Sequence, residues 1–471
     1  MSALASRWRG STSQQLAVVA ALLPLFVLAG AGTNVLIARF GPAKVVWVIA
    51  IFVGGLWAMG NVRRTCAVLA LALAFPFRTK LLFGVQVFTT QLLLVAIAGL
   101  GLVEIALRRR QVPRGLIVPV GLIAAGAIIA SLAGPYPGSA LPRTVWGVAL
   151  PLTAAVVLAT TLHGRGVGGI VIALAVGVAG ESCIALLQAA GKAPAIFPTW
   201  EANRAVGLFL HPNILGSFLM TAMLILAGVA TVAWRYLPVT ATALVAVIML
   251  GLGGIVVTES RGALIGLLAG TVVLVVLMLV SRRGMAALGM LAVIALALAV
   301  TVPRLPEPER QQFGERLAQL TRPGAEVGRE RIYKLAEAVI SQYPYTGVGP
   351  LTFGQMGSRR SSVPGVECCL THAHNVALEG FLSIGPLGLA GLLWLCAGSM
   401  SRLLRLRHRR SDPIVAGWAI GALGAIVALL VAGMFDFVFW QPEMLVLLLL
   451  ILTSGYALVR PVEETPEPPS R

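Results

Sequence analysis

Two histidines stand where a polar segment gives way to a long apolar run, in the sequence THAHNVALEGFLSIGPLG at residues 371–388. Imidazole has an ordinary pKa of about 6.5, so a histidine in neutral solvent is mostly uncharged and can accept a proton from a hydroxyl group. This chemistry makes His374 a candidate general base, with His372 and Asn375 as supporting residues. A histidine that only caps its helix is the simpler alternative.

Arginines near the ends of other apolar runs suggest the kind of binding site that would lie next to such a base. Arg261 follows Glu259 in TESRGALIG. Arg204 opens RAVGLFLHPNILG, and Arg331 lies in the long polar segment. A guanidinium group stays charged, and its planar fork matches the oxygens of a phosphate. The three arginines therefore predict a diphosphate-binding site, unless each one only anchors a loop or pairs with a carboxylate.

Other polar residues near the same ends support this site or suggest a metal. The set of candidate site residues also includes His211, Glu259, Tyr333 and Asp436. Histidines and carboxylates could bind zinc, with Glu379 as a further ligand, but His-x-His stands alone here without His-Glu-x-x-His or a related spacing. We therefore predict no metal site.

The elements that must position these residues are membrane helices. Of the 471 residues, 58% are hydrophobic and 11% are charged, against about 25% charged in a soluble domain. A span needs roughly 20 mostly apolar residues. The predicted fold is an all-α polytopic membrane protein with about 12–14 transmembrane helices. The candidate runs are 16–38, 44–60, 65–83, 85–107, 115–133, 145–162, 167–190, 207–232, 237–258, 260–281, 284–302, 375–400, 414–435 and 441–459.

The net charge of +18 follows from the topology of such a protein. Lys and Arg concentrate in cytoplasmic loops. With the N-terminus in the cytoplasm, the cytoplasmic loops hold 17 arginines, and the opposite short loops hold 8 Lys and Arg residues. All candidate site residues then face the outside of the membrane. The lipid bilayer explains the charge, and no nucleic acid is expected as a partner.

The chain divides into four predicted parts. Residues 1–302 form an N-terminal transmembrane bundle, 303–373 a large outer loop, 374–459 the C-terminal transmembrane helices, and 460–471 a disordered cytoplasmic tail. The loop contains short helices, because apolar residues recur there at helical spacing before a proline. These apolar residues are Ile332, Leu335, Ala336, Val339 and Ile340. The first apolar run is too long for a cleavable signal peptide and is predicted to remain as an anchor.

Several segments resemble the bacterial O-antigen ligase and O-antigen polymerase superfamily. Five of them carry the resemblance, in this order: RAVGLFLHPNILG at 204–216, ESRGAL at 259–264, RERIYKLAEAVISQYPYTGVGPLTFG at 329–354, HN followed nine residues later by GPLG at 374–388, and Asp436. The resemblance covers about half of the chain. The first 190 residues are similar to the family only in forming apolar helices.

The resemblance implies a membrane-embedded glycosyltransferase with its active site at the periplasmic face of the bacterial inner membrane. Its donor would be a glycan on undecaprenyl diphosphate, its acceptor a sugar hydroxyl, and it would need neither metal nor cofactor. His374 would be the general base, and Arg261 and Arg331 would hold the diphosphate, with Arg204 as a third candidate. Attack from the face opposite the diphosphate would invert the anomeric configuration.

Three activities remain open at this point. A ligase would use lipid A core as acceptor, whereas a polymerase would use a second lipid-linked glycan. Family ligases have about twelve spans, two fewer than the candidate runs here, so either the N-terminal segmentation or the subgroup differs. Leu-Ala-Gly follows Gly388 in place of a polar continuation, which favours the polymerase. A transporter or flippase of lipid-linked glycans is the more distant alternative, but transporters place charges at mid-membrane in paired halves.

Overall fold

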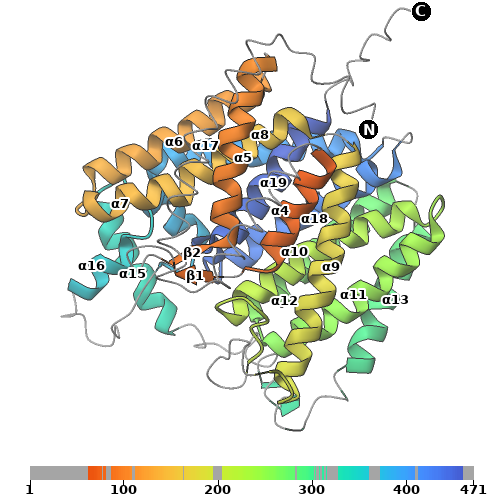
Figure 1. Cartoon of the computed structure of the whole chain (residues 1–471). Coiled ribbons are helices and arrows are strands. Elements are labelled where there is room, and N and C mark those ends of the chain that lie inside the picture. Colours follow the sequence, from red (N-terminus) through yellow and green to blue (C-terminus); the bar gives the residue numbers. More distant parts are fainter. Residues whose placement is uncertain are drawn as a thin grey trace, which may run out of the picture. The chain divides into compact units, whose positions relative to one another are not determined.

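The computed structural model describes residues 62–459 apart from 77, 81–85, 109–111, 163, 195–203, 282–283, 302, 304–306, 308–309, 312–313, 316–326, 360–371 and 409–411. The described chain is almost entirely helical (Figure 1). Its only sheet is a pair of three-residue antiparallel strands, β1 (Arg78–Lys80) and β2 (Gln86–Phe88). The N-terminal half contributes α4 (Val62–Ala74), α5 (Thr89–Arg108), α6 (Arg114–Ala133), α7 (Pro137–Thr144), η3 (Val145–Ala149), α8 (Leu150–Thr161), α9 (Gly164–Ala189) and α10 (Pro212–Ala233). The remaining helices are α11 (Pro238–Thr258), α12 (Arg261–Val280), α13 (Gly284–Thr301), α15 (Val327–Gln342), α16 (Phe353–Arg359), α17 (Val376–Leu406), α18 (Pro413–Gly433), η6 (Val438–Trp440) and α19 (Pro442–Leu458).

Eight helical segments in the described residues are long and apolar enough to cross a membrane. They are Gly115–Ala133, Pro137–Thr160, Gly166–Ala189, Pro212–Ala233, Pro238–Thr258, Arg261–Val280, Val376–Leu406 and Pro413–Gly433. The chain is thus an all-α polytopic membrane protein, as predicted. The predicted runs at 16–38 and 44–60 lie outside the described residues, as does the predicted tail at 460–471.

The helix α10 is the centre of the bundle, since its neighbours bury it along almost its whole length. It packs on α18, α11 and α12. The contact with α18 is close because both helices present glycines: a Cβ on Gly228 would lie 2.4 Å from the backbone nitrogen of Gly421. Small residues allow such backbone approach between membrane helices. This packing fixes the start of α10, where His211 and Asn213 lie.

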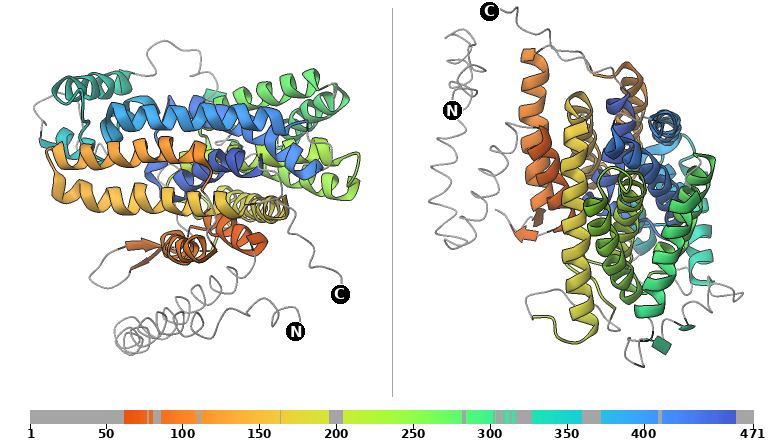
Figure 2. Two further views of the ribbon diagram at one scale, coloured as in Figure 1. Left: turned by 90° about the horizontal axis from the view of Figure 1, so that it is seen from above. Right: turned by 90° about the vertical axis from the view of Figure 1, so that its right-hand side faces the viewer.

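The helix α17 is broken inside the membrane segment and packs along α6 (Figure 2). Gly385 has φ 64° and ψ 177°, which interrupts the helix just before Pro386. Gly388 contacts α6 closely, because a Cβ on Gly126 would lie 2.4 Å from the Gly388 nitrogen. The GPLG segment therefore permits the close approach of α6.

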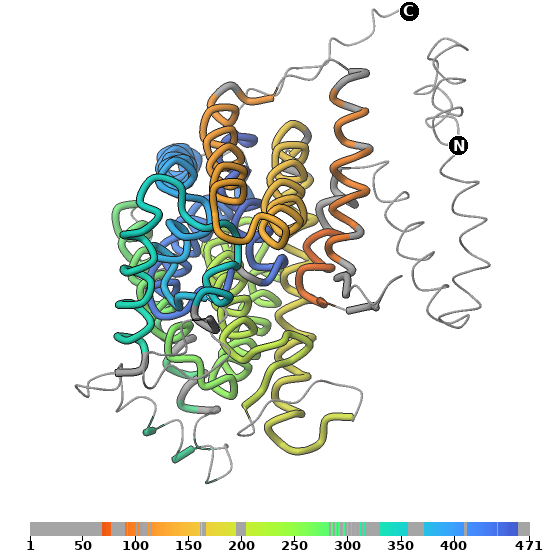
Figure 3. The backbone as a smooth tube through the Cα atoms, turned by 90° about the vertical axis from the view of Figure 1, so that its left-hand side faces the viewer, coloured from red at the N-terminus to blue at the C-terminus, as the bar shows by residue number. Residues whose placement is uncertain are grey.

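The turn that follows α15 fills the break in α17. The backbone N–H groups of Val348 and Gly349 donate to the Leu382 carbonyl at 2.7 and 3.1 Å. Buried Leu335, Ala336 and Val339 on α15 share a small apolar cluster with Leu382. The helices α15 and α16 therefore lie against α17 (Figure 3). The apolar spacing in the loop sequence correctly predicts the buried face of α15.

Two span boundaries differ from the sequence expectation. The predicted run 207–232 begins at Pro212, because residues 204–210 form a loop in which Gly207 has φ 57°. Gln188 of α9 holds this loop by accepting hydrogen bonds from the N–H groups of Val206 and Gly207 at 3.0 and 2.8 Å. The predicted run 145–162 begins earlier, at Pro137, because a π-helical turn in η3 joins α7 to α8.

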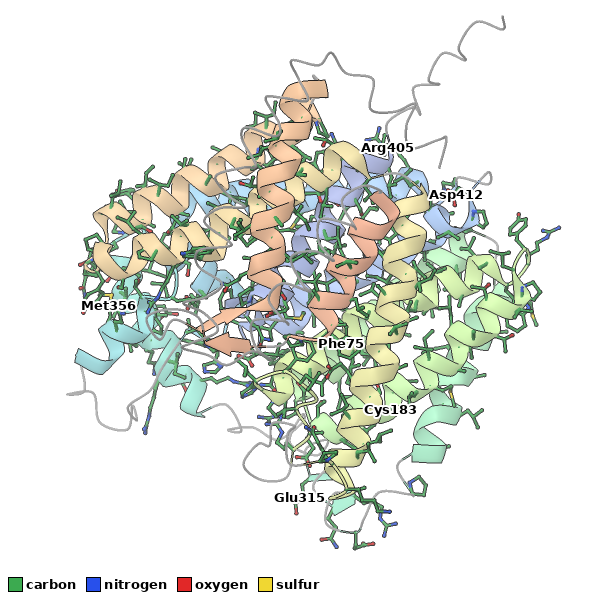
Figure 4. All side chains as sticks on the ribbon, viewed as in Figure 1. Phe75, Cys183, Glu315, Met356, Arg405 and Asp412 are labelled. Atoms are coloured by element: carbon green, nitrogen blue, oxygen red, sulfur yellow. The ribbon has the colours of Figure 1, made fainter. Side chains whose placement is uncertain are left out.

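The connection between α17 and α18 marks the end of these helices that is remote from the candidate residues. Arg405 and Asp412 lie there, away from Met356 of α16 (Figure 4). Asp412 caps α18 by accepting a hydrogen bond from the Val415 N–H at 3.0 Å. His374 and Asp436 lie at the opposite ends of the same two helices. The candidate site is therefore built at one end of the bundle.

Candidate active site

His374 lies two residues before the start of α17, in a strained backbone conformation. Its φ of 50° places it in the left-handed region, which a non-glycine residue rarely adopts. Asn375 caps α17, since its side-chain oxygen accepts from the N–H groups of Ala377 and Leu378 at 2.9 and 3.2 Å. Such a cap is worth about 1 kcal/mol. The capping role that the sequence left open for His374 therefore belongs to Asn375.

A buried carboxylate also fixes the backbone of the turn that precedes α17. Glu379, in the first turn of α17, is fully buried and accepts a hydrogen bond from the Ala373 N–H at 2.8 Å. Its other oxygen accepts from the Ser383 hydroxyl at 2.9 Å. Ala373 stands between the two histidines, so Glu379 fixes the backbone that carries both rings.

Both histidines point at one carboxylate oxygen. His374 Nδ1 lies 2.9 Å and His372 Nε2 3.1 Å from Asp436 Oδ1. His372 and Asp436 are buried, whereas the His374 side chain is one-third exposed. Burial by itself raises the pKa of Asp436, but hydrogen bonds from the two histidines and their electrostatic attraction outweigh it and hold the pKa well below its ordinary value. Asp436 is therefore a carboxylate.

This carboxylate decides where His374 carries its proton. An ionised carboxylate has no hydrogen to donate, so each imidazole must present an N–H to Asp436. His374 then has its proton on Nδ1 and its lone pair on Nε2. The arrangement matches the way an aspartate orients a general-base histidine in hydrolases. His374 can take a proton from a hydroxyl group, and Asp436 stabilises the cation that forms.

Asn213 connects this base to an arginine. Its Nδ2 donates to Asp436 Oδ2 at 2.7 Å, and its Oδ1 accepts from Arg204 at 3.1 Å. Arg204 Nε also donates to the Thr258 carbonyl at 3.0 Å, which ties the 204–210 loop to the end of α11. Arg204 and Asp436, predicted as separate site residues, are thus joined through a residue that the sequence reasoning did not select.

Arginines and carboxylates line a pocket of about 100 Å³ next to Asp436. Its charged residues are Arg204, Glu259, Arg261, Arg329 and Asp436, so three positive charges face two negative ones. Glu259 ends α11 with φ 51°, and Ser260 caps α12 by accepting from the Ala263 N–H at 3.4 Å. The turn between α11 and α12 thus brings Glu259 and Arg261 to the same pocket.

Three helices begin at this pocket. Arg261 is the first residue of α12, Asn213 the second of α10 and Arg329 the third of α15. A helix N-terminus carries a partial positive charge, which favours a bound anion. The pocket therefore combines three arginines with three helix ends, a suitable environment for an anion with several oxygens.

The other predicted residues lie around this centre. Arg331 is exposed on α15 and is not among the pocket-lining residues. Tyr333 donates from its hydroxyl to the Met434 carbonyl at 3.2 Å, which ties α15 to the end of α18. His211 caps α10, where its Nδ1 accepts from the Asn213 N–H at 3.1 Å. Burial lowers the pKa of His211 to about 4, and the nearby charge of Arg204 also lowers it, against the opposing effect of Asp436.

One metal-ligating group exists among the described residues. The ligand atoms of His372, His374 and Asp436 all lie within 4.8 Å of one another. These three residues are among the possible zinc ligands in the sequence, but the only ligand spacing there is His-x-His, because the carboxylate comes from a different helix connection 62 residues beyond His374. The geometry is thus compatible with both a base-orienting carboxylate and a metal site.

Asn213, Arg329 and Glu379 belong to this site by their positions and contacts but are outside the set of site residues predicted from the sequence. Asn213 stands two residues after His211 in HPNILG, and Arg329 two residues before Arg331. The spacing of Glu379 five residues after His374 offered a signal, since a carboxylate in the first turn of a membrane helix needs a partner.

The comparisons with known proteins bear on these features. Residues 244–393, roughly a third of the chain, match the family model described as O-antigen ligase. No curated protein matches the chain. The matched region runs from α11 to the middle of α17 and includes Glu259, Arg261 and both histidines. The match supports the resemblance given by the sequence motifs, and residues 244–393 of this membrane protein are similar to the O-antigen ligase family.

Proposed function

We propose that this protein transfers a glycan from an undecaprenyl diphosphate donor to an acceptor hydroxyl at the outer face of a bacterial inner membrane. The family supports ligase- or polymerase-type glycan transfer in general. The detailed proposal rests on the position of Asp436, which contacts the proposed base and also lines the arginine pocket. It accepts from His374 at 2.9 Å, and it lines the pocket that holds Arg204, Arg261 and Arg329.

In the proposed reaction the acceptor hydroxyl attacks the anomeric carbon of the donor sugar. His374 Nε2 takes the hydroxyl proton, and a new glycosidic C–O bond forms. The bond between the anomeric carbon and the diphosphate oxygen breaks, so the electron pair leaves with undecaprenyl diphosphate. Attack opposite the leaving group inverts the anomeric configuration. A positioned base of this kind contributes about 10²–10⁴-fold to the rate.

The arginine pocket stabilises the departing diphosphate. Negative charge grows on the leaving oxygens as the glycosidic bond breaks, and fixed guanidinium groups interact more strongly with that charge than with the intact donor. Arg261 and Arg204 belong to this pocket, and Arg329 enters it from α15. Arg331 remains a proposed diphosphate ligand that could engage a donor larger than the pocket. None of these steps requires a metal ion.

Ligase activity, with lipid A core as acceptor, is the first proposal, and polymerase activity on a second lipid-linked glycan is the second. Leu-Ala-Gly after Gly388 favours the polymerase. The deciding experiment supplies purified protein with a lipid diphosphate glycan and offers each acceptor separately. Transfer to lipid A core alone supports the ligase, and extension of a lipid-linked glycan supports the polymerase. Movement of lipid-linked glycan across vesicles without any acceptor would instead support a transporter.

A further inference from the structure

The His372, His374 and Asp436 cluster has a second chemical use besides orienting a base. We propose that His372 Nε2, His374 Nδ1 and Asp436 Oδ1 bind a divalent ion of the zinc type, and that occupancy of this site inhibits glycan transfer. The binding part stands on the geometry alone. The inhibitory part rests on the proposed function, because it needs His374 to be the base.

The ligand types and spacing suit zinc. Zinc binds histidine nitrogen and carboxylate oxygen at about 2.0–2.2 Å in a tetrahedral arrangement, so neighbouring ligand atoms lie roughly 3.3 Å apart. The two nitrogens lie 3.1 and 2.9 Å from the shared oxygen, and all three atoms lie within 4.8 Å of one another. Small side-chain rotations therefore make room for the ion. The one-third exposure of His374 leaves solvent to supply the fourth ligand.

The surroundings hold the carboxylate in the required orientation. Asn213 Nδ2 donates to Asp436 Oδ2 at 2.7 Å, and the Phe437 N–H donates to Asp436 Oδ1 at 2.9 Å. Asp436 thus presents Oδ1 toward the two rings while its other oxygen stays bound. Such second contacts orient metal ligands and support metal affinity. Glu379 holds the Ala373 backbone between the histidines, so both rings come from a fixed turn.

A metal in this position would remove the base. A neutral imidazole carries one proton, and in the metal-free cluster that proton lies on Nδ1 of His374, directed at Asp436. An ion that takes the Nδ1 lone pair forces the same proton onto Nε2. Nε2 then donates a hydrogen bond and has no lone pair for an acceptor hydroxyl. The number of protons on the ring is unchanged, but His374 can no longer act as a base.

Zinc titration of the purified protein by calorimetry tests the binding part. We expect one zinc ion per chain in the wild type and at least about tenfold weaker binding in His372→Ala. His408→Ala is the matched control, because His408 is an exposed histidine beyond the far end of α17. Its affinity should equal that of the wild type. Absence of saturable binding, or equal affinity in His372→Ala and wild type, would overturn the site.

A spectroscopic measurement covers the case in which His372→Ala does not fold. X-ray absorption at the zinc edge of the wild-type protein should show two imidazole nitrogens and oxygen ligands. Sulfur coordination, or oxygen ligands alone, would contradict the assignment.

Transfer assays test the inhibitory part. Saturating Zn²⁺ should reduce transfer at least tenfold, and a chelator should restore it, whereas Mg²⁺ at the same concentration should have no such effect because it prefers oxygen ligands. Zinc that binds at this cluster without slowing transfer would overturn the inhibitory role and the base assignment together. A preparation that binds zinc as expected but transfers no glycan under any condition would leave the metal site standing and refute the proposed function.

Discussion

At the scale of single residues, the site depends on Asp436. Its Oδ1 accepts from two histidines and from the Phe437 N–H, while its Oδ2 accepts from Asn213. A carboxylate that accepts several hydrogen bonds stays ionised far below neutral pH. Its charge fixes the tautomer of His374 and also borders the arginine pocket. Substitutions around Asp436 should therefore separate base chemistry from donor binding.

Asp436→Asn should lower kcat by about 10²–10⁴-fold and change the KM for donor little. An amide has no negative charge and can donate a hydrogen bond, so it no longer holds the proton on His374 Nδ1. Steady-state transfer kinetics measure both constants. Asp412→Asn is the control, because Asp412 caps α18 at the remote end and asparagine caps equally well. A rise in KM with an unchanged kcat for Asp436→Asn would contradict its assigned role.

Arg261→Ala should raise the KM for donor and lower kcat, and Arg261→Lys should lose less activity because it keeps the charge without the planar fork. The same order is expected at Arg331. A comparison of Arg329→Ala with Arg331→Ala shows which of the two serves the donor, and the pocket geometry favours Arg329. Arg405→Ala, at the remote end of α17, is the control. Equal activities of the alanine and lysine variants at Arg261 would argue against diphosphate binding there.

His211 should make stability depend on pH. Its pKa is about 4 in the folded protein against about 6.5 in an unfolded chain, so the unfolded state binds more protons between these values. Stability should then fall as the pH drops from about 6.5 to 4. His211→Asn, which keeps a capping oxygen, should flatten this dependence. Thermal unfolding midpoints across that pH range measure it, and identical profiles for both proteins would refute the assignment.

At the scale of elements, the break in α17 positions the histidine turn. The GPLG segment makes two close contacts. Gly385 contacts the turn after α15, and Gly388 contacts α6. The loop helix α15 is thereby held against α17, the helix that follows the histidine turn. Tyr333 adds a second tie from α15 to the end of α18. The arginines of α15 and the histidine turn before α17 therefore depend on one shared junction.

Gly385→Ala should destabilise the protein by about 1–3 kcal/mol. The added Cβ would require φ 64° in a non-glycine residue and would lie 2.5 Å from the Thr346 carbonyl oxygen. Gly380→Ala in the same helix is the matched control, since its nearest neighbour would be 3.4 Å away. Thermal unfolding in detergent compares the two variants. An unfolding midpoint for Gly385→Ala at or above that of Gly380→Ala would contradict this account of the break.

At the scale of the whole molecule, the sequence predicts the helices well because a membrane span is a long apolar run with few alternatives. Most predicted runs from 115 onward coincide with helices to within a few residues. The exceptions depend on tertiary contacts, as where Gln188 holds the 204–210 loop outside α10. Residue types likewise indicated a base and an anion site. The sequence did not predict which residue binds which, because Asn213, Asp436 and His374 meet only after three distant segments pack together.

The contrast between Arg329 and Arg331 shows the same limit at the site itself. Both lie in the first turns of α15, and residues two apart on a helix point in different directions. Only the packing of Leu335, Ala336 and Val339 decides which arginine faces the pocket. Spacing within one segment therefore identifies a candidate helix, but its rotation depends on the surface that it covers.

The most direct test of the proposed chemistry is single-turnover glycan transfer by His374→Ala, with donor binding measured on the same preparation. Because His374 is the proposed base and the arginine pocket the proposed donor site, we expect donor affinity within about twofold of wild type and a transfer rate lowered about 10²–10⁴-fold. Folded His374→Ala protein that transfers glycan at the wild-type rate would contradict the account.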